Sequence, residues 1–220
     1  MMENKVELLS YWGNDEMIAN VARVSYGKDA SNYTEEQNAK LLKYLWEHGH
    51  TSPFRHPHLQ FRVKCPIFVE RQLFKHVVGV SVNSISGRYV DFSDEYYMVP
   101  EGEWRKQSKS SKQGSDGLCD AQKIPDEVQR EVIRTCKNAY AYLVGLGVSK
   151  EQARLVLPLS LMTEFIWTGS LQAFLHMYAL RSKLDAQKET RDIVLEMCRL
   201  VENIEGNPFE HTLKMIKPNK

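Results

Sequence analysis

The chain has 220 residues and a mass of 25.5 kDa, which is enough for one domain that buries its own core. Its 29 basic and 28 acidic side chains nearly cancel, so the overall charge favours neither a nucleic-acid partner nor a membrane surface. Any anion that binds must therefore be held by a local cluster of cations.

The first elements in chain order are a strand and two helices. Residues 5–13 have the composition of a strand. Residues 13–27 have apolar side chains at helical spacing after a cap at Asn14 or Asp15. Residues 33–49 predict a second helix, because a threonine N-cap, acidic residues in the first turn and a terminal glycine mark its boundaries.

A second strand and a third helix follow. Residues 57–66 alternate between polar and apolar side chains, as a strand with one buried face does. Pro66 is suited to open a helix over residues 66–77. Residues 89–99 predict an extended segment after that helix.

The second half of the chain is predicted to be mainly helical. Residues 105–123 are polar and predict a surface loop. Helices are expected over residues 125–147, 149–158, 171–182 and 185–204. Helices before and after strand-bearing segments favour an α+β fold over alternating β/α units.

One short segment, "EHGHTSPFRHPH", concentrates histidines. His48, His50, His56 and His58 form two H-x-H pairs, and neutral imidazole is a common metal ligand. No cysteine ligand is close by in the sequence, and the alternating strand turns His58 away from the others. A structural role at a helix end and contact with an organic ligand are the alternatives to a metal site.

Cysteine usage indicates a reducing environment. The four cysteines are scattered without a C-x-x-C pair, and the polar start "MMENKVELLS" has no apolar signal stretch, so a cytoplasmic protein is expected. Cys65 alternates in phase with apolar strand residues, which favours a buried structural thiol over a nucleophile. No apolar run approaches the roughly 20 residues that span a bilayer, and membrane insertion is not expected.

The stretch "RQLFKHVVGVSVNSISGRYVDF", residues 71–92, begins like a helix and ends as a polar, glycine-containing segment. Its hydroxyls, amide and backbone N–H groups near a glycine allow a close approach to an anionic ligand. An ordinary polar loop is the alternative interpretation.

Several arginines are candidates for ligand binding. A guanidinium offers a planar fork that matches phosphate or a pyrimidine edge, whereas lysine acts as a point charge. Taken singly, each arginine fits a solvated surface cation. Arg154 and Arg181 differ because each lies beside a strongly apolar run.

These segments resemble blocks of the flavin-dependent thymidylate synthases. The family signature is an Arg-His-Arg triplet followed after seven residues by a serine, usually in Ser-Gly-Arg-Tyr or Ser-Arg-Arg-Tyr, and "RQLFKHVVGVSVNSISGRY" is similar to it. Residues 22–27, 41–56, 64–72, 152–168 and 174–189 resemble further family blocks in the same order. Together they span most of the chain outside residues 100–124.

The chain departs from the signature at three points. Lys75-His76-Val77 stands in place of Arg-His-Arg, which keeps a cation without its fork at the first position and loses the charge at Val77. Eight residues rather than seven separate Val77 from Ser86, and Ser84 stands where a glutamate is common.

The resemblance implies a fold, an assembly and a reaction. The fold is α+β, a mixed antiparallel sheet flanked by helices, and we expect one domain over residues 1–220. The family assembles as a homotetramer with sites shared between subunits. It converts dUMP to dTMP with FAD, taking carbon from methylenetetrahydrofolate and reducing power from NADPH, without a cysteine nucleophile.

The resemblance also implies residue roles. Arg181 matches the arginine that stabilises charge on the pyrimidine. The substrate-binding candidates are Arg71, Gln72, Ser84, Ser86, Gly87, Arg88, Arg154 and Arg181. The flavin-binding candidates are Ser25, His50, Ser52, Lys75, His76, Val77, Asn83, Ser84, Ser170 and His176. No metal is expected. The alternative hypotheses are a nucleotide- or RNA-binding homologue that lost catalysis and a histidine-metal hydrolase.

Overall fold

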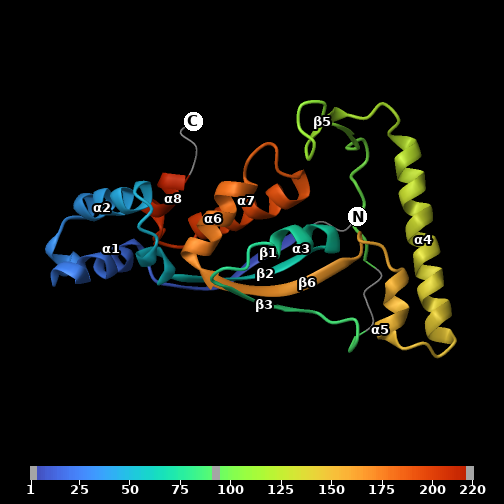
Figure 1. Cartoon of the computed structure of the whole chain (residues 1–220), viewed down its shortest axis with the longest axis horizontal. Coiled ribbons are helices and arrows are strands. Elements are labelled where there is room, and N and C mark those ends of the chain that lie inside the picture. Colours follow the sequence, from blue (N-terminus) through green and yellow to red (C-terminus); the bar gives the residue numbers. More distant parts are fainter. Residues whose placement is uncertain (1–3, 91–94, 217–220) are drawn as a thin grey trace.

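The computed structural model describes residues 4–90 and 95–216. Its centre is a four-stranded sheet in the order β1-β2-β6-β3, and every neighbouring pair is antiparallel. Helices pack along one side of this sheet and extend beyond both of its ends (Figure 1). The strands are β1 Lys5–Trp12, β2 His58–Pro66, β3 Val80–Ser84 and β6 Met162–Ser170. The α+β class predicted from the sequence is confirmed.

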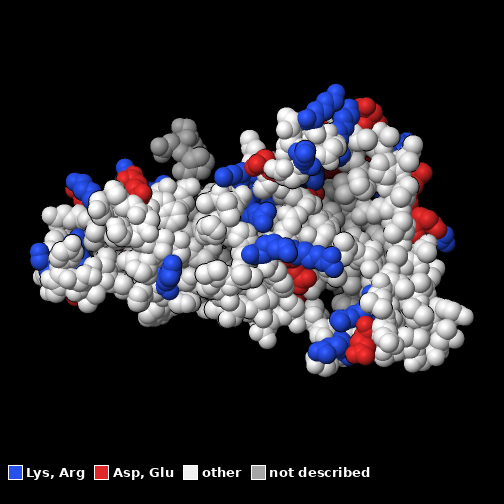
Figure 2. All heavy atoms as spheres, viewed as in Figure 1, with Lys and Arg blue, Asp and Glu red and all other residues white. Residues whose placement is uncertain are grey.

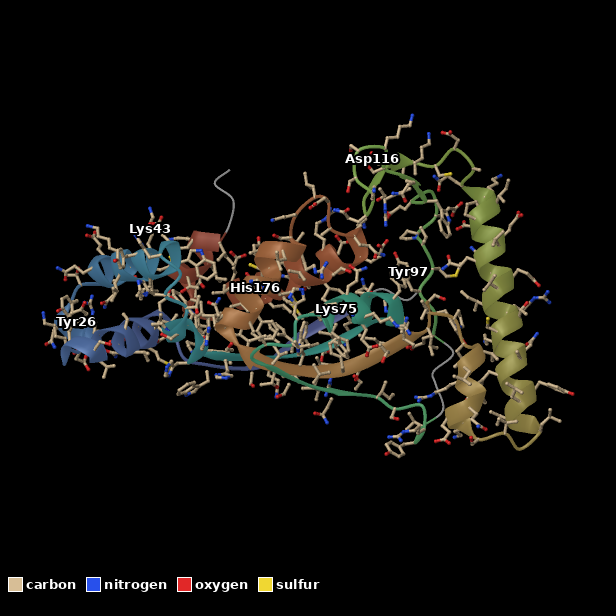
Figure 3. All side chains as sticks on the ribbon, in the orientation of Figure 1. Tyr26, Lys43, Lys75, Tyr97, Asp116 and His176 are labelled. Carbon is tan, nitrogen blue, oxygen red and sulfur yellow. The ribbon has the colours of Figure 1, made fainter. Side chains whose placement is uncertain are left out.

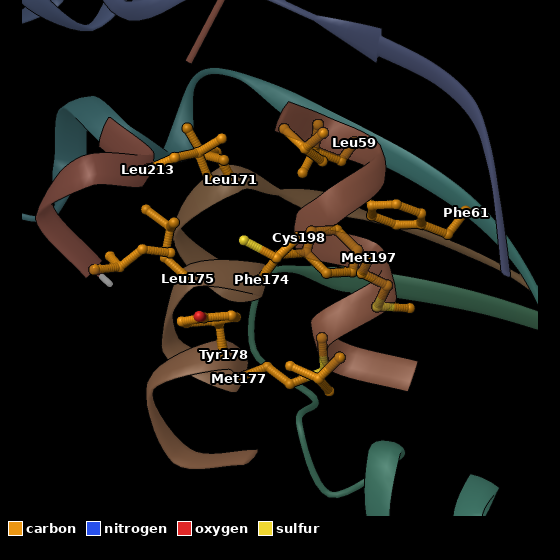
Figure 4. A pocket seen from close by; sticks show the side chains of 13 residues that line it. Leu59, Phe61, Leu171, Phe174, Leu175, Met177, Tyr178, Met197, Cys198 and Leu213 are labelled. Atoms are coloured by element: carbon orange, nitrogen blue, oxygen red, sulfur yellow. The ribbon is translucent and has the colours of Figure 1, made fainter. Parts of the chain in front are cut away.

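The alternation predicted for β2 is present. Leu59, Phe61, Val63 and Cys65 are all at most 2% exposed, while the residues between them are exposed or half-buried. Their face packs against α6 (Leu171–Arg181) and α7 (Lys188–Glu202). Figure 4 shows side chains of β2, α6, α7 and α8 (Glu210–Ile216) turned toward one another around a small apolar cavity. Burial of this continuous apolar face is the main source of stability.

The first two helices begin where the sequence indicates. α1 (Asp15–Arg23) is capped by Asn14, whose side chain accepts from the Met17 backbone N–H at 2.8 Å. α2 (Glu35–Glu47) begins with a reciprocal capping box between Thr34 and Gln37. Such caps satisfy backbone donors that have no partner inside the helix.

Three predicted helices have different bounds. α3 (Ile67–Leu73) ends four residues early, because the chain turns back toward β3. α4 (Lys123–Gly145) begins two residues before Pro125. The helix predicted over residues 149–158 is reduced to α5 (Lys150–Ala153) and the 3₁₀ turn η4 (Arg154–Val156), since Leu157 is extended before a proline.

Several elements were not predicted. Strands β3 and β6 and the last helix, α8 (Glu210–Ile216), were missed. The predicted surface loop at 105–123 is wrong in part, because it contains a hairpin of β4 (Arg105–Gln107) and β5 (Ser115–Leu118). Within the extended segment expected at 89–99, residues 91–94 lie outside the described residues, and Tyr96 forms a bridge with Leu161.

The remaining elements are short. Three further 3₁₀ turns are η1 Val24–Tyr26, η2 Ala30–Asn32 and η3 Ser52–Arg55. Among the described residues, no helix is long and apolar enough to cross a bilayer.

Candidate active-site pocket

A pocket of about 430 Å³ lies beside the turn that joins α3 to β3. The turn forms one wall, and the end of β6 with the start of α6 forms the other. In Figure 3, Lys75 and His176 lie near the centre of the molecule, where these elements meet. The lining residues are Arg55, Lys75, His76, Val77, Val78, Gly79, Ser170, Gln172, Ala173 and His176. Half of them belong to the predicted flavin set.

Backbone hydrogen bonds hold both walls in place. The His76 N–H donates to the Leu73 carbonyl at 3.0 Å, and the Ser170 N–H donates to the Gly79 carbonyl at 2.9 Å. Gly79 has a φ of 76°, and a Cβ there would lie 3.0 Å from Ser170 Oγ. Glycine is therefore needed both for the left-handed backbone and for the close approach of β6. This turn explains why the helix of residues 71–92 gives way to a polar segment.

Ser170 connects the pocket to the start of α6. Its side chain is 5% exposed, and its Oγ accepts from the Ala173 N–H at 3.3 Å as the N-cap of the helix. The other backbone donors of this first turn have no partner inside the helix. The N-terminus of α6 thus adds a partial positive charge next to Gln172 and Ala173.

Arg181 is connected to the pocket by a hydrogen bond to His76, which lines it. The Arg181 Nε–H donates to His76 Nε2 at 3.1 Å. Because a guanidinium only donates, His76 must be a neutral imidazole that accepts at Nε2. Burial lowers the pKa of His76 below its ordinary value, and electrostatic interactions with Arg181 and His176 lower it further. The His76 and His176 rings meet edge to face, with their centroids 6.2 Å apart.

The lining residues fit an anionic ligand that also carries a hydrogen-bond donor. Arg55 and Lys75 supply positive charge, and Figure 2 shows Lys and Arg side chains gathered across the middle of this face of the molecule. Gln172 Oε1 is buried and has no hydrogen-bond partner among the described residues. A buried acceptor of this kind requires a donor, which a bound molecule could provide. A flavin nucleotide has both features, phosphates for the cations and a ring N–H for the amide.

Three substrate-binding candidates lie on α3 and β3, outside the lining of this pocket. Gln72 is half-buried one turn before His76, and its amide contacts Gln187 and Thr190 of α7. Ser84 is exposed at the end of edge strand β3, where its Oγ donates to Glu70 at 3.5 Å. Arg71 is exposed on α3.

The remaining substrate candidates lie outside the pocket lining. Ser86 and Gly87 form the turn after β3, where the Arg88 N–H donates to Ser86 Oγ at 3.3 Å. Arg154 lies in η4, and its Nε–H donates to the Glu151 carbonyl at 3.2 Å. Arg88 and Arg154 are both exposed.

Four flavin candidates besides Ser84 also lie outside the lining of this pocket. Ser25 is in η1, beside Tyr26, which Figure 3 places at the far end of the molecule from Lys75 and His176. The other three are His50, Ser52 and Asn83. Within one chain, the structure therefore brings together only part of the predicted flavin site.

Sequence reasoning missed five pocket residues, which are Arg55, Val78, Gly79, Gln172 and Ala173. Arg55 was not predicted because only the histidines of its segment were considered as ligand-binding residues. Gln172 lies two residues after Ser170, and the spacing Ser-x-Gln at a helix start was the signal that could have identified it.

Two of the four clustered histidines have hydrogen-bond partners on the backbone. His48 Nδ1 contacts the Tyr44 carbonyl at 2.8 Å, and His58 Nδ1 contacts the His56 carbonyl at 2.7 Å. Over residues 4–90 and 95–216, no three His, Cys, Asp or Glu side chains are grouped as metal ligands. Burial raises the pKa of Cys65, which keeps it a neutral thiol and a poor nucleophile.

Comparison with known proteins identifies relatives along most of the chain. A family model described as "Thymidylate synthase complementing protein" matches residues 7–205. The flavin-dependent thymidylate synthase of Thermus thermophilus is 42% identical over 197 residues, covering 89% of this chain and 70% of that protein. The corresponding enzyme of Kosmotoga olearia is 39% identical over 197 residues, covering 89% of this chain and 84% of that protein.

A solved structure shares the fold. The UMP/dUMP methylase PolB of Streptomyces cacaoi, bound with 5-Br dUMP, has a TM-score of 0.85 and 26% identity, covering 97% of this chain and 94% of that one. Both the family model and the curated relatives extend over the pocket and the sheet that carries it. The chain therefore belongs to the flavin-dependent thymidylate synthase family.

Proposed function

We propose that this chain converts dUMP to dTMP, with FAD as cofactor, methylenetetrahydrofolate as carbon donor and NADPH as reductant. The observation that carries the proposal is the pocket at the α3–β3 turn, where predicted flavin residues lie next to Arg181 through His76. Membership of the family and the likeness to PolB, described as a UMP/dUMP methylase, support the nucleotide substrate.

The pocket residues are suited to hold a flavin nucleotide. Lys75 and Arg55 would pair with its phosphates, and Gln172 Oε1 would accept a hydrogen bond from it. Arg55 would supply the second cation where Val77 replaces an arginine of the family triplet, because both residues line the same cavity. A bound flavin would supply the hydride chemistry that no side chain provides.

Arg181 is suited to act on the pyrimidine. Its Nε is occupied by His76, and its terminal nitrogens make no hydrogen bond to the described residues. Uracil C5 is a weak nucleophile, and the buried Cys65 thiol is unsuited to activate it by adding to C6. A guanidinium fork directed at the ring would instead stabilise the negative charge that develops as C5 attacks.

Assembly of subunits would complete the site. Ser25, Arg88 and Arg154 lie outside the pocket within one chain, and a homotetramer with shared sites would allow neighbouring subunits to contribute them. We place the enzyme in the cytoplasm, because its scattered cysteines suit a reducing compartment.

The test is dTMP formation by the purified protein. The complete mixture contains dUMP, methylenetetrahydrofolate, FAD and NADPH, and each component is omitted in turn. We expect dTMP only in the complete mixture, with UMP run in parallel as the competing nucleotide. The Cys65→Ala variant should remain active, since the thiol is buried.

Other outcomes of the same assay would refute the proposal. Binding of dUMP and FAD without turnover would identify a nucleotide-binding homologue. Colourless protein with stoichiometric zinc would favour the metal hydrolase. Loss of all turnover in a folded Cys65→Ala protein would overturn the mechanism without a cysteine nucleophile.

A further inference from the structure

Polar side chains at the start of α7 are connected to Gln72 of α3 by a chain of hydrogen bonds. Thr190 Oγ1 donates to Gln72 Oε1 at 3.2 Å, and Gln72 Nε2 donates to Gln187 Oε1. Gln187 Nε2 in turn donates to Glu189 Oε2 at 3.0 Å. The Gln72 amide is thus held on both sides by residues of α7 or its N-cap.

Glu189, the last residue in this chain of hydrogen bonds, is buried and ionised. It is 5% exposed, and its Oε1 accepts from Arg105 Nη2 at 2.6 Å and from the Tyr97 hydroxyl at 3.3 Å. Burial alone would raise the pKa of Glu189, but the hydrogen bond and charge of Arg105 outweigh it, and the pKa is lowered. Burial and the charge of Glu189 raise the pKa of Tyr97, so its phenol remains a donor.

The charge of Glu189 determines the direction of the bonds that follow. An ionised carboxylate accepts hydrogen bonds and donates none. Gln187 must therefore turn its NH₂ group toward Glu189 and its carbonyl toward Gln72. Gln72 must then turn its NH₂ toward Gln187 and its carbonyl toward the Thr190 hydroxyl.

We propose that Glu189 is a positioning residue that, through Gln187, fixes the direction of the Gln72 amide presented to the nucleotide. The inference rests on the proposed function, together with the contact to dUMP that the family resemblance implies for Gln72. After its two internal bonds, the Gln72 amide retains one N–H and one oxygen lone pair for a ligand. The direction of the amide decides which side of the ligand each of them faces.

The inference also gives the β4–β5 hairpin a role. Arg105 is the first residue of β4, and its bond to Glu189 ties the hairpin to α7. The hairpin therefore helps to keep Glu189 ionised, although no residue of it lines the pocket at the α3–β3 turn.

The first test is the Glu189→Gln variant, which keeps the shape of the side chain and removes its charge. Its oxygen would stay with Arg105 and Tyr97, so its new NH₂ would face Gln187 and reverse both amides. We expect dUMP affinity of the flavin-loaded protein to fall about tenfold by calorimetric titration, with turnover at saturating dUMP changed less than about twofold. Glu196→Gln changes a half-buried acid on the same helix that pairs with Arg199; it is the matched control and should leave affinity unchanged.

A second variant tests the chain of hydrogen bonds while leaving the ion pair between Glu189 and Arg105 intact. Gln187→Ala keeps the Glu189–Arg105 contact, and we expect the same loss of affinity of about tenfold. In a Gln72→Ala background neither change should weaken binding further, because coupled residues give non-additive losses. Two outcomes would overturn the inference and leave the proposed function standing, provided that the wild type binds dUMP. One is an additive loss of affinity in the double variants, and the other is normal affinity in the Glu189 and Gln187 variants. A wild-type protein without affinity for dUMP would overturn the proposed function and the inference with it.

Discussion

At the scale of single residues, the central contact is the hydrogen bond from Arg181 to His76. It fixes the guanidinium by its Nε and leaves the planar fork of terminal nitrogens available. It also requires a neutral His76, because an imidazolium has no acceptor. The chemistry of one residue therefore depends on the protonation of the other, and each can be tested separately.

The first prediction concerns Arg181→Lys. Lysine keeps the positive charge but loses both the fork and the Nε donor. If the guanidinium stabilises charge that develops only in the transition state, turnover should fall about 100- to 1,000-fold while dUMP binding weakens much less. Single-turnover flavin oxidation and dUMP titration on the same variant measure the two effects. Collapsed affinity with a near-normal rate at saturating dUMP would make Arg181 only an anchor.

The second prediction is a pH dependence set by His76. Its pKa is lowered from 6.5 by burial, Arg181 and His176, so it is neutral at pH 6.5 and above. As pH falls through the lowered pKa, His76 gains a charge, loses its acceptor and repels Arg181 and Lys75. Activity should therefore hold at neutral pH and through the range in which an ordinary histidine titrates, and be lost only at the lower pH at which His76 is protonated.

A matched pair of variants tests whether His76 causes this loss of activity at low pH, the acid limb of the pH profile. His76→Gln keeps an acceptor that does not titrate, so the limb should disappear from its pH profile. His176→Gln should retain the limb, whatever its effect on the rate, because Arg181 does not bond to His176. An unchanged limb in the His76→Gln enzyme would show that another group causes it.

At the scale of elements, the site depends on the turn between α3 and β3. Gly79 permits both the left-handed backbone of this turn and the approach of Ser170. The third prediction follows: Gly79→Ala should lower the free energy of unfolding by about 1 to 2 kcal/mol and also weaken flavin binding. Gly147→Ala is the control, because Gly147 has a φ of 83° but its added Cβ would meet no atom of the described residues within 4 Å.

Urea unfolding and FAD titration separate the two effects. Both alanine variants should lose stability, since both place a Cβ on a left-handed backbone. The Gly79 variant should lose more, because its Cβ would also crowd Ser170 Oγ. Only the Gly79 variant should lose flavin affinity. Equal flavin affinity in the two variants would mean that the turn does not shape the cofactor site.

Sequence patterns predicted the elements whose signals are local. The cap predicted at Asn14 or Asp15, the N-cap at Thr34 and the alternation of β2 act within a few residues, and each is present in the structure, where Asn14 is the first of these caps. Strand β6 was missed because it is a central strand between β2 and β3, so its burial depends on partners far away in the sequence. The β4–β5 hairpin was missed because its residues are polar, and pairing rather than burial defines it.

At the scale of the whole molecule, the site residues also differ in whether the sequence alone could predict them. The resemblance identified Lys75, His76 and His176, which the fold brings into one pocket. It did not identify Arg55 or Gln172, whose place in the pocket depends on how η3 and α6 pack. Nor could the sequence show that Ser25 lies far along the molecule from Lys75, which makes it a candidate contribution from another subunit.

The fourth prediction is therefore the assembly. In addition to the dispersed site residues, Ile124, Val128 and Val132 form an exposed apolar stripe along α4, a surface of the kind that assemblies often cover. Light scattering should report a mass about four times 25.5 kDa. A stable monomer with full activity would contradict sites shared between subunits.

The most direct test of the account is the absorbance spectrum of the purified protein, recorded with and without dUMP. We propose that a flavin binds in the pocket at the α3–β3 turn, within reach of the nucleotide held near Arg181 and Gln72. We expect a bound flavin spectrum, or one that forms on addition of FAD, and a shift of its bands when dUMP is added. A colourless protein that takes up no FAD, or a bound flavin that does not respond to dUMP, would contradict it.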